Sequence, residues 1–86
     1  MDKERLYKLR SEATNIKPII NVGKGGITDQ LIMELKKHIK ERHLVKVKVL
    51  KSASYEDGID AIAENLAEAT RTTVIDVRGS SVVLYR

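Results

Sequence analysis

Residues 19–29 read IINVGKGGITD, in which a β-branched run, a glycine-rich loop and a helix start follow one another directly. Glycines in the spacing GxxG, at Gly23 and Gly26, let the backbone reach positive φ and come close to a ligand, so that successive amides can line a site for an anion. A helix that begins directly afterwards, at Thr28, adds unpaired N–H groups and the positive end of its dipole. The segment therefore predicts a strand, a phosphate-holding loop and a helix in that order.

The same loop excludes two nucleotide-binding patterns. Lys24 is not followed by Ser or Thr, which a P-loop requires, and Thr28 stands where GxGxxG needs its last glycine. A mononucleotide is therefore disfavoured, and the backbone of a polynucleotide is the anion that fits the loop. The alternative is a purely structural one, in which the glycines make a tight turn and a close packing contact.

Length and composition indicate one small folded domain. The chain has 86 residues, of which 42% are hydrophobic and 33% charged. A domain of this size buries about 60% of its unfolded surface, which leaves no room for a deep catalytic cavity. No apolar run approaches the ~20 residues of a membrane span, so we expect a cytoplasmic protein without membrane contact. The absence of cysteine excludes disulfides, thiolate catalysis and the usual zinc motifs.

Positive charge is concentrated in the first part of the chain. Residues 1–51 hold 13 Lys and Arg against 6 Asp and Glu, whereas residues 52–86 hold 3 against 6. A polarised charge distribution orients a domain in the field of a polyanion, and basic domains are frequent among nucleic-acid-binding proteins. Ordinary solvated surface charge is the alternative interpretation.

Hydrophobic periodicity predicts the element order α-β-α-β-α-β-β. Helices are expected over residues 3–14, from 28 to about 43 and from 52 or 54 to about 70, and strands over 18–22, 44–50, 72–77 and 82–85. In the second strand, alternation turns the valines to one side and Lys46 and Lys48 to the other, which predicts a basic outer face. The pattern indicates a single compact α/β domain over residues 1–86, a four-stranded mixed sheet with helices packed on it.

Three segments together resemble the CRM domain (chloroplast RNA splicing and ribosome maturation). They are the loop and helix start at residues 22–28, the strand residues 44–48, and the closing hairpin with residues 77–79 and 83–86. The resemblance spans nearly the whole chain. It implies a fold similar to the C-terminal domain of bacterial translation initiation factor three, with the GxxG loop as part of an RNA-binding surface.

The resemblance also implies a cellular role. Stand-alone prokaryotic members of the family are similar to ribosome-associated proteins that act on precursors of the large subunit. Gly23 and Gly26 fall on the two glycines of the family motif, and Lys24 and Gly25 fall on its variable pair. Because the chain holds one such domain and no second, ribosomal RNA is favoured over intron splicing as its target.

The side chains favour recognition of the RNA backbone. Aromatic residues make up only 3% of the chain, so the sheet lacks a platform on which bases could stack. We expect the loop and nearby cations to hold successive phosphates. The predicted RNA-binding residues are Gly23, Lys24, Gly25, Gly26, Lys36, Lys37, Lys40, Arg42, Lys46 and Lys48.

Nothing in the sequence predicts catalysis, a metal site or a cofactor. His38 and His43 are five residues apart and so do not share a helical face, and no carboxylate pattern makes them ligands or a catalytic pair. No serine lies in a nucleophile motif. We expect a protein without enzymatic activity.

Three other interpretations remain open at this stage. In a KH domain the GxxG loop joins two helices, whereas Pro18 and the β-branched residues before this loop favour a strand. A small protein that binds duplex DNA could use the same basic face. A protein-interaction module could dock through a sheet edge or through the acidic side of the third helix. The RNA target, the assembly stage, protein partners and the oligomeric state are not specified by the sequence.

Overall fold

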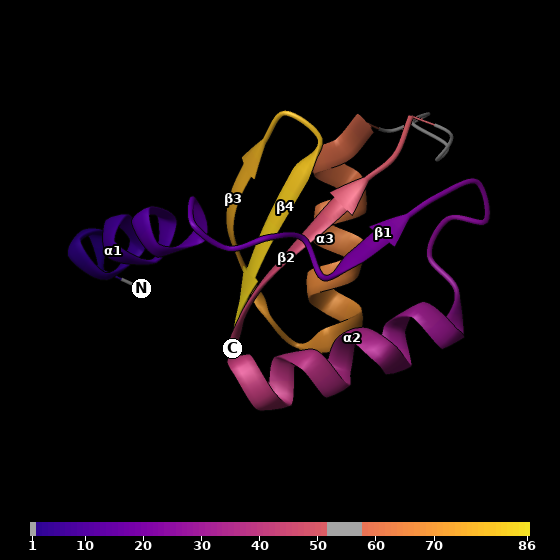
Figure 1. Ribbon diagram of the computed structural model, residues 1–86, viewed down its shortest axis with the longest axis horizontal. Helices are drawn as coiled ribbons and strands as arrows, with labels where there is room; N and C mark the ends of the chain where they lie inside the picture. Colours follow the sequence, from indigo (N-terminus) through magenta and orange to yellow (C-terminus); the bar gives the residue numbers. More distant parts are fainter. Residues whose placement is uncertain (1, 52–57) are drawn as a thin grey trace.

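The elements of the computed structural model follow one another in the predicted order (Figure 1). The structure describes residues 2–51 and 58–86. Its helices are α1 (Lys3–Ala13), α2 (Asp29–Arg42) and α3 (Gly58–Thr70), and its strands are β1 (Ile20–Val22), β2 (Leu44–Val49), β3 (Thr73–Arg78) and β4 (Ser81–Tyr85). The predicted fold class, a single compact α/β domain with a mixed four-stranded sheet, is confirmed.

The sheet has the order β1-β2-β4-β3, with β1 parallel to β2 and the other neighbours antiparallel. Helix α2 is the crossover between the parallel strands, so the loop before it leaves the sheet at the C-terminal end of β1. The turn between β3 and β4 reaches the same end, where the amide of Val49 donates to the carbonyl of Ser80 at 2.7 Å. We call this end, with the Gly23–Gly26 loop and the Gly79–Ser80 turn, the loop end of the sheet.

The main core lies between the sheet and the two helices α2 and α3. Helix α2 turns an apolar side to this core, since Leu35 and Ile39 are buried and Leu31 and Ile32 pack partly against it. The inward side chains of the sheet complete this cluster together with α3; its buried members include Val22, Val45, Val47, Val49, Ala63, Leu66, Val82 and Leu84. The alternation of β2 therefore buries its valines as expected.

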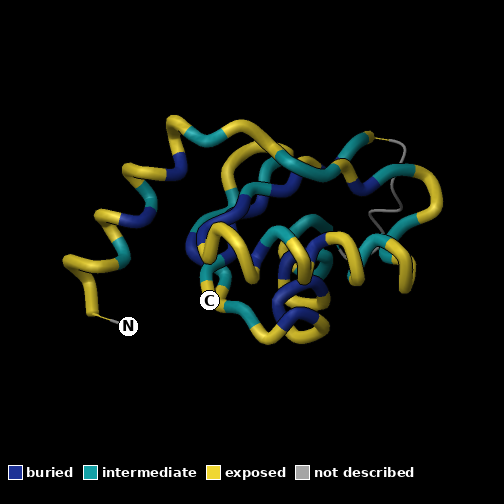
Figure 2. The backbone as a smooth tube through the Cα atoms, turned by 60° about the horizontal axis from the view of Figure 1, so that its bottom comes forward, coloured by how far each residue is buried: buried dark blue, intermediate teal, exposed yellow. Residues whose placement is uncertain are grey.

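Helix α1 packs on the opposite face of the sheet and forms a second, smaller cluster. Leu9 and Ala13 contact Leu44, Ile75 and Val83. Only one side of α1 is buried, and the helix extends away from the rest of the molecule (Figure 2).

Because of α1, the outer face of β2 is not uniformly solvated. Lys46 is half-buried and its Nζ donates to the carbonyl of Ala13 at 3.3 Å, at the C-terminal end of α1. Lys48, one pleat further along, is exposed. The predicted basic outer face is open at Lys48 and partly covered at Lys46.

Several element boundaries differ from the sequence-based expectations. β1 begins at Ile20 and not at residue 18, although the amide of Ile19 already donates to the carbonyl of Lys46 at 3.0 Å. Helix α2 ends at Arg42, and His43 follows with a φ of 64°. The proposed start of the third helix at Ser52 or Ser54 lies outside the described residues.

The hairpin turn is shorter than predicted. Its two residues are Gly79, with a φ of 58°, and Ser80, so that Arg78 and Ser81 belong to the paired strands. In β3 the pairing shifts between Val74 and Asp76, which marks a β-bulge.

The second cluster indicates how much the packing of α1 contributes to the free energy of unfolding. Replacing the buried Leu9 by alanine removes most of the side chain that α1 inserts against the sheet, so Leu9→Ala should lower the free energy of unfolding by about 2 to 3 kcal/mol. Tyr7→Ala is the control on the same helix, because Tyr7 is 61% exposed and its loss should change stability by no more than about 0.5 kcal/mol. Urea unfolding of both variants measures the difference, and equal losses would contradict this account of the α1 contact.

Candidate nucleic-acid interface

The GxxG loop forms a tight turn that leaves its central amides free. The amide of Gly26 donates to the carbonyl of Gly23 at 2.9 Å and closes the turn. Within residues 2–51 and 58–86, the amides of Lys24 and Gly25 have no hydrogen-bond acceptor, and both residues are exposed. The loop thus presents main-chain donors and one ammonium group to solvent.

The start of α2 adds further donors at the same corner. Thr28, where the helix was predicted to begin, is its N-cap, and its Oγ1 accepts from the amide of Leu31 at 3.1 Å. The preceding amides of the first turn, those of Asp29 and Gln30, have no acceptor among the described residues. Unpaired amides and the positive end of the helix dipole together favour an anion at this corner.

The loop joins a strand to a helix, β1 to α2. In a KH domain the corresponding loop joins two helices, so the KH interpretation does not fit this connection.

Gly26 adopts a left-handed backbone conformation that favours glycine over other residues. Gly26 has a φ of +68°, and a Cβ atom added there would meet nothing within 4 Å, so the strain of an alanine would be purely conformational. Gly26→Ala should therefore lower the free energy of unfolding by about 1 kcal/mol. Gly25 lies outside the left-handed region, and its added Cβ would make an ordinary 3.9 Å contact with Cγ2 of Thr28.

The matched control is Gly25→Ala, for which we expect no loss of stability. Chemical denaturation of the two variants is the measurement. A greater loss for Gly25→Ala than for Gly26→Ala would show that the turn is not formed as described.

The structure separates the predicted cations into two groups. Those of α2 are all exposed and run along that helix; they are Lys36, Lys37, Lys40 and Arg42. At 1.5 Å per residue, the end of α2 is about 20 Å from the loop. Lys46 and Lys48 lie on the other face of the sheet, Lys46 beneath the C-terminal end of α1 and Lys48 further toward the loop end.

Lys48 is nevertheless close to the loop in the fold. It pairs with Asn21 of β1, two residues before Gly23. Arg78, at the end of β3, is exposed on the same face of the loop end and was not among the predicted site residues. The sequence contained the information needed to find Arg78. Val77 and Val82 flank the turn and point into the main core, and because side chains alternate along a strand, Arg78 and Ser81 point to the other face.

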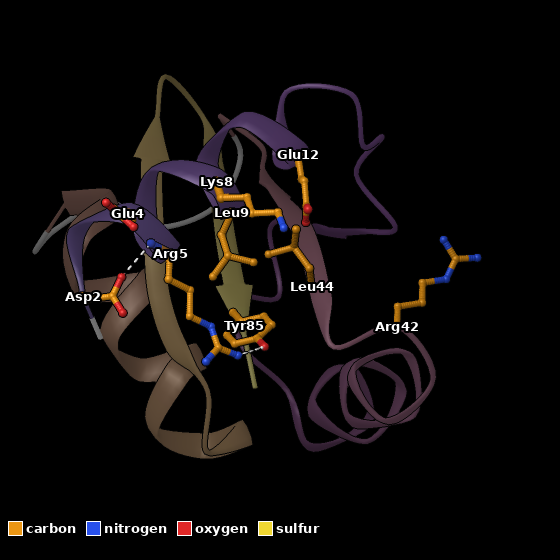
Figure 3. Close-up of a pocket in the computed structure, with 9 residues that line it drawn as sticks. All are labelled: Asp2, Glu4, Arg5, Lys8, Leu9, Glu12, Arg42, Leu44 and Tyr85. Carbon is orange, nitrogen blue, oxygen red and sulfur yellow. Dashed lines mark hydrogen bonds between the residues drawn. The ribbon is translucent and has the colours of Figure 1, made fainter.

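A cavity lies at the other end of the sheet, beneath α1. It has a volume of about 590 Å³ and is lined by Asp2, Glu4, Arg5, Lys8, Leu9, Glu12, Arg42, Leu44 and Tyr85. In Figure 3, Arg5 reaches across to Tyr85 while Arg42 points away from the cavity. The guanidinium of Arg5 lies 5.3 Å from the ring centre of Tyr85 and donates to its hydroxyl at 2.5 Å.

Three carboxylates balance three cations in this lining, so the cavity has no bias toward a polyanion. We interpret it as the edge of the α1 contact. The part of the chain that the structure describes contains no group of three His, Cys, Asp or Glu residues that could hold a metal ion. Nor does any helix within that part have the length and apolar character needed to cross a membrane.

The architecture is that of a small α/β domain with an exposed GxxG loop between a parallel edge strand and its crossover helix. The family model of the CRS1 / YhbY (CRM) domain matches residues 1–86. The chain belongs to the CRM domain family, as the sequence resemblance predicted.

Relatives of the chain carry names that refer to RNA. It is 36% identical to "Probable RNA-binding protein YqeI" of Bacillus subtilis, over 91% of this chain and 79% of that protein. It is 43% identical to "Probable RNA-binding protein MJ0652" of Methanocaldococcus jannaschii over 91% of its own length, which spans 58% of the archaeal protein. The solution structure of SAV1595 from Staphylococcus aureus superimposes with a TM-score of 0.83 at 40% identity, covering 100% of this chain and 88% of that one.

Proposed function

We propose that this protein is a non-catalytic RNA-binding protein of the cytoplasm that binds ribosomal RNA or precursors of the large ribosomal subunit and assists ribosome assembly. In this account, residues 1–86 act as one CRM-like RNA-binding domain. The GxxG loop and the basic surface that adjoins it make the contact. Membership of the CRM family and the names of the relatives support RNA as the partner.

The observation that carries the proposal is the free main chain of the exposed loop. The amides of Lys24 and Gly25 have no acceptor within the described residues, and they lie beside the N-terminus of α2. Backbone amides and a helix dipole form a ready phosphate site, to which the ammonium of Lys24 adds a full charge. Such a site recognises the phosphodiester chain and carries little base specificity.

The target is identified by crosslinking the protein to RNA in cells and sequencing the bound fragments. Large-subunit ribosomal RNA and its precursors should be enriched over messenger and transfer RNA. Enrichment of another RNA would leave RNA binding in place and overturn the ribosomal assignment. Recovery of protein partners that survives nuclease treatment, without crosslinked RNA, would favour an interaction module.

Charge reversal in the loop tests the site itself. Lys24→Glu should weaken RNA binding by about tenfold or more, which corresponds to roughly 1.4 kcal/mol. The melting temperature should not change, because Lys24 is exposed and no contact of its side chain holds the fold within the described residues. Fluorescence anisotropy with labelled RNA and thermal unfolding by circular dichroism are the two measurements.

The control is Lys3→Glu, which makes the same change of charge at an exposed position of α1. It should leave RNA affinity nearly unaltered. Equal losses in the two variants would mean that only the net charge matters and that the loop is not the site. Preference for duplex DNA over RNA in the same assay would favour the DNA-binding alternative.

A further inference from the structure

A row of polar side chains crosses the sheet at its loop end. The register pairs Asn21 with Lys48, Lys48 with Ser81, and Ser81 with Arg78, so one residue from each strand stands side by side. We call these four residues the loop-end row. Because neighbouring strands are about 4.8 Å apart, the row extends roughly 14 Å from the edge strand β1 to the edge strand β3.

All four side chains belong to the face opposite α2 and α3. In each strand the neighbouring residue points into the main core, namely Val22, Val49, Val82 and Val77. Alternation along a strand therefore sets the row outward. Asn21, Lys48 and Arg78 are exposed and Ser81 is half-buried.

Helix α1 leaves most of this row uncovered. Its apolar contacts are with Leu44, Ile75 and Val83, further from the loop end, and the chain after it crosses the sheet at the level where Ile19 pairs with Lys46. Figure 1 shows this segment passing across the sheet below the β3–β4 turn. The end of α1 approaches the row where Arg10 and Ala13 line a cavity with Arg78 and Ser81, and it leaves Asn21, Lys48 and Arg78 exposed.

A small basic cavity opens between the end of α1 and the row. It has a volume of about 150 Å³ and is lined by Arg10, Ala13, Thr14, Lys46, Asp76, Arg78, Ser81 and Val83. Three cations face a single carboxylate in this lining. Asp76 lies 3.8 Å from Nε of Arg78, a long contact whose arginine side chain is 75% exposed, so it holds Arg78 only weakly.

We infer that the loop-end row is a second RNA-contact surface, across which the RNA strand held by the GxxG loop continues. This rests on the proposed function and adds to it the path of the strand and three further residues, Asn21, Arg78 and Ser81. Lys48 and Arg78 neutralise phosphates, while Asn21 and Ser81 supply uncharged hydrogen-bonding groups suited to phosphate or 2′-hydroxyl oxygens.

Two features favour a nucleic-acid strand as the occupant. The row carries two cations and no carboxylate, and it begins two residues before Gly23, so it is continuous with the loop. It carries no apolar or aromatic side chain, which disfavours base stacking or an apolar protein surface. Contact through phosphate and sugar should therefore be insensitive to base sequence.

The salt dependence of binding tests the row. Each single-strand phosphate contact contributes about 0.7 to the slope of log K against log salt, so its loss weakens binding about fourfold near physiological salt. Lys48→Ala and Arg78→Ala should each show this loss and this change of slope. The double variant should lose about fifteenfold if the contacts are independent. The probes are labelled oligouridylate and a transcript of the crosslinked RNA segment.

Arg86→Ala is the matched control for Arg78→Ala, since Arg86 is exposed and follows Tyr85 at the opposite end of the sheet. Asp76→Asn should change RNA affinity in the opposite direction. It removes the carboxylate that lines the small cavity with little change of shape, so RNA affinity should rise by about twofold or more. Thermal unfolding of every variant shows that the fold is retained.

The outcomes separate this inference from the proposed function. If Lys24→Glu weakens binding while Lys48→Ala and Arg78→Ala match Arg86→Ala in affinity and slope, the loop is the site and the row is not. A lower RNA affinity of the Asp76→Asn variant, with its fold retained, also contradicts the proposed contact between RNA and the loop-end row. If the unmodified protein binds neither probe, both the proposed function and this inference are wrong.

Discussion

The alternation of β2 is the constraint on which the rest of the structure depends. Val45, Val47 and Val49 are each fully buried, and β2 pairs with both β1 and β4. A shift of its register by one residue would bury Lys46 and Lys48 in the main core and expose the valines, at a cost of several kcal/mol for each charge left without a partner. The register of β2 fixes that of β1, and therefore the position at which the glycine loop leaves the sheet.

The same constraint separates structural from solvent-facing lysines on one short strand. Lys46 lies beneath the end of α1, and its ammonium donates to the carbonyl of Ala13 in the last turn of that helix, which also accepts from the amide of Ile16. A cation is favoured there by the helix dipole as well. Within residues 2–51 and 58–86 Lys48 makes no such bond, and its side chain is exposed at the loop end. Lys46 and Lys48 thus point to the same face of the sheet but have different surroundings, because α1 covers only part of that face.

Much of this fold was predictable because its signals are local. The β-branched run before Gly23, the cap at Thr28 and the period-two pattern of β2 each depend on neighbouring residues, and the order of elements follows from them. The placement of α1 was not predictable in this way. Its contact with Ile75 and Val83 joins residues more than 60 positions apart, and periodicity alone says which side of a helix is apolar but not what it meets.

The candidate site was predictable in part for the same reason. The loop is a continuous segment, and its exposure and free amides agree with the expected phosphate site, although its contact with RNA stays a prediction. The adjoining cations were chosen by charge without regard to the face of the sheet, so residues of α2 were grouped with Lys46 and Lys48. Arg78 was missed because a turn was expected where the structure has the last residue of β3.

The bulge of β3 has a consequence for how the domain behaves beside other copies of itself. β3 is an edge strand, and a regular edge offers a row of unpaired backbone groups to which another chain can add. Between Val74 and Asp76 the register shifts, so Ile75 and Asp76 both turn toward the α1 face and the edge is locally kinked. An incoming strand cannot match this irregular spacing over its length. The irregularity, together with the Arg10 side chain that donates to the carbonyl of Ile75, thus protects this part of the edge from sheet extension and aggregation.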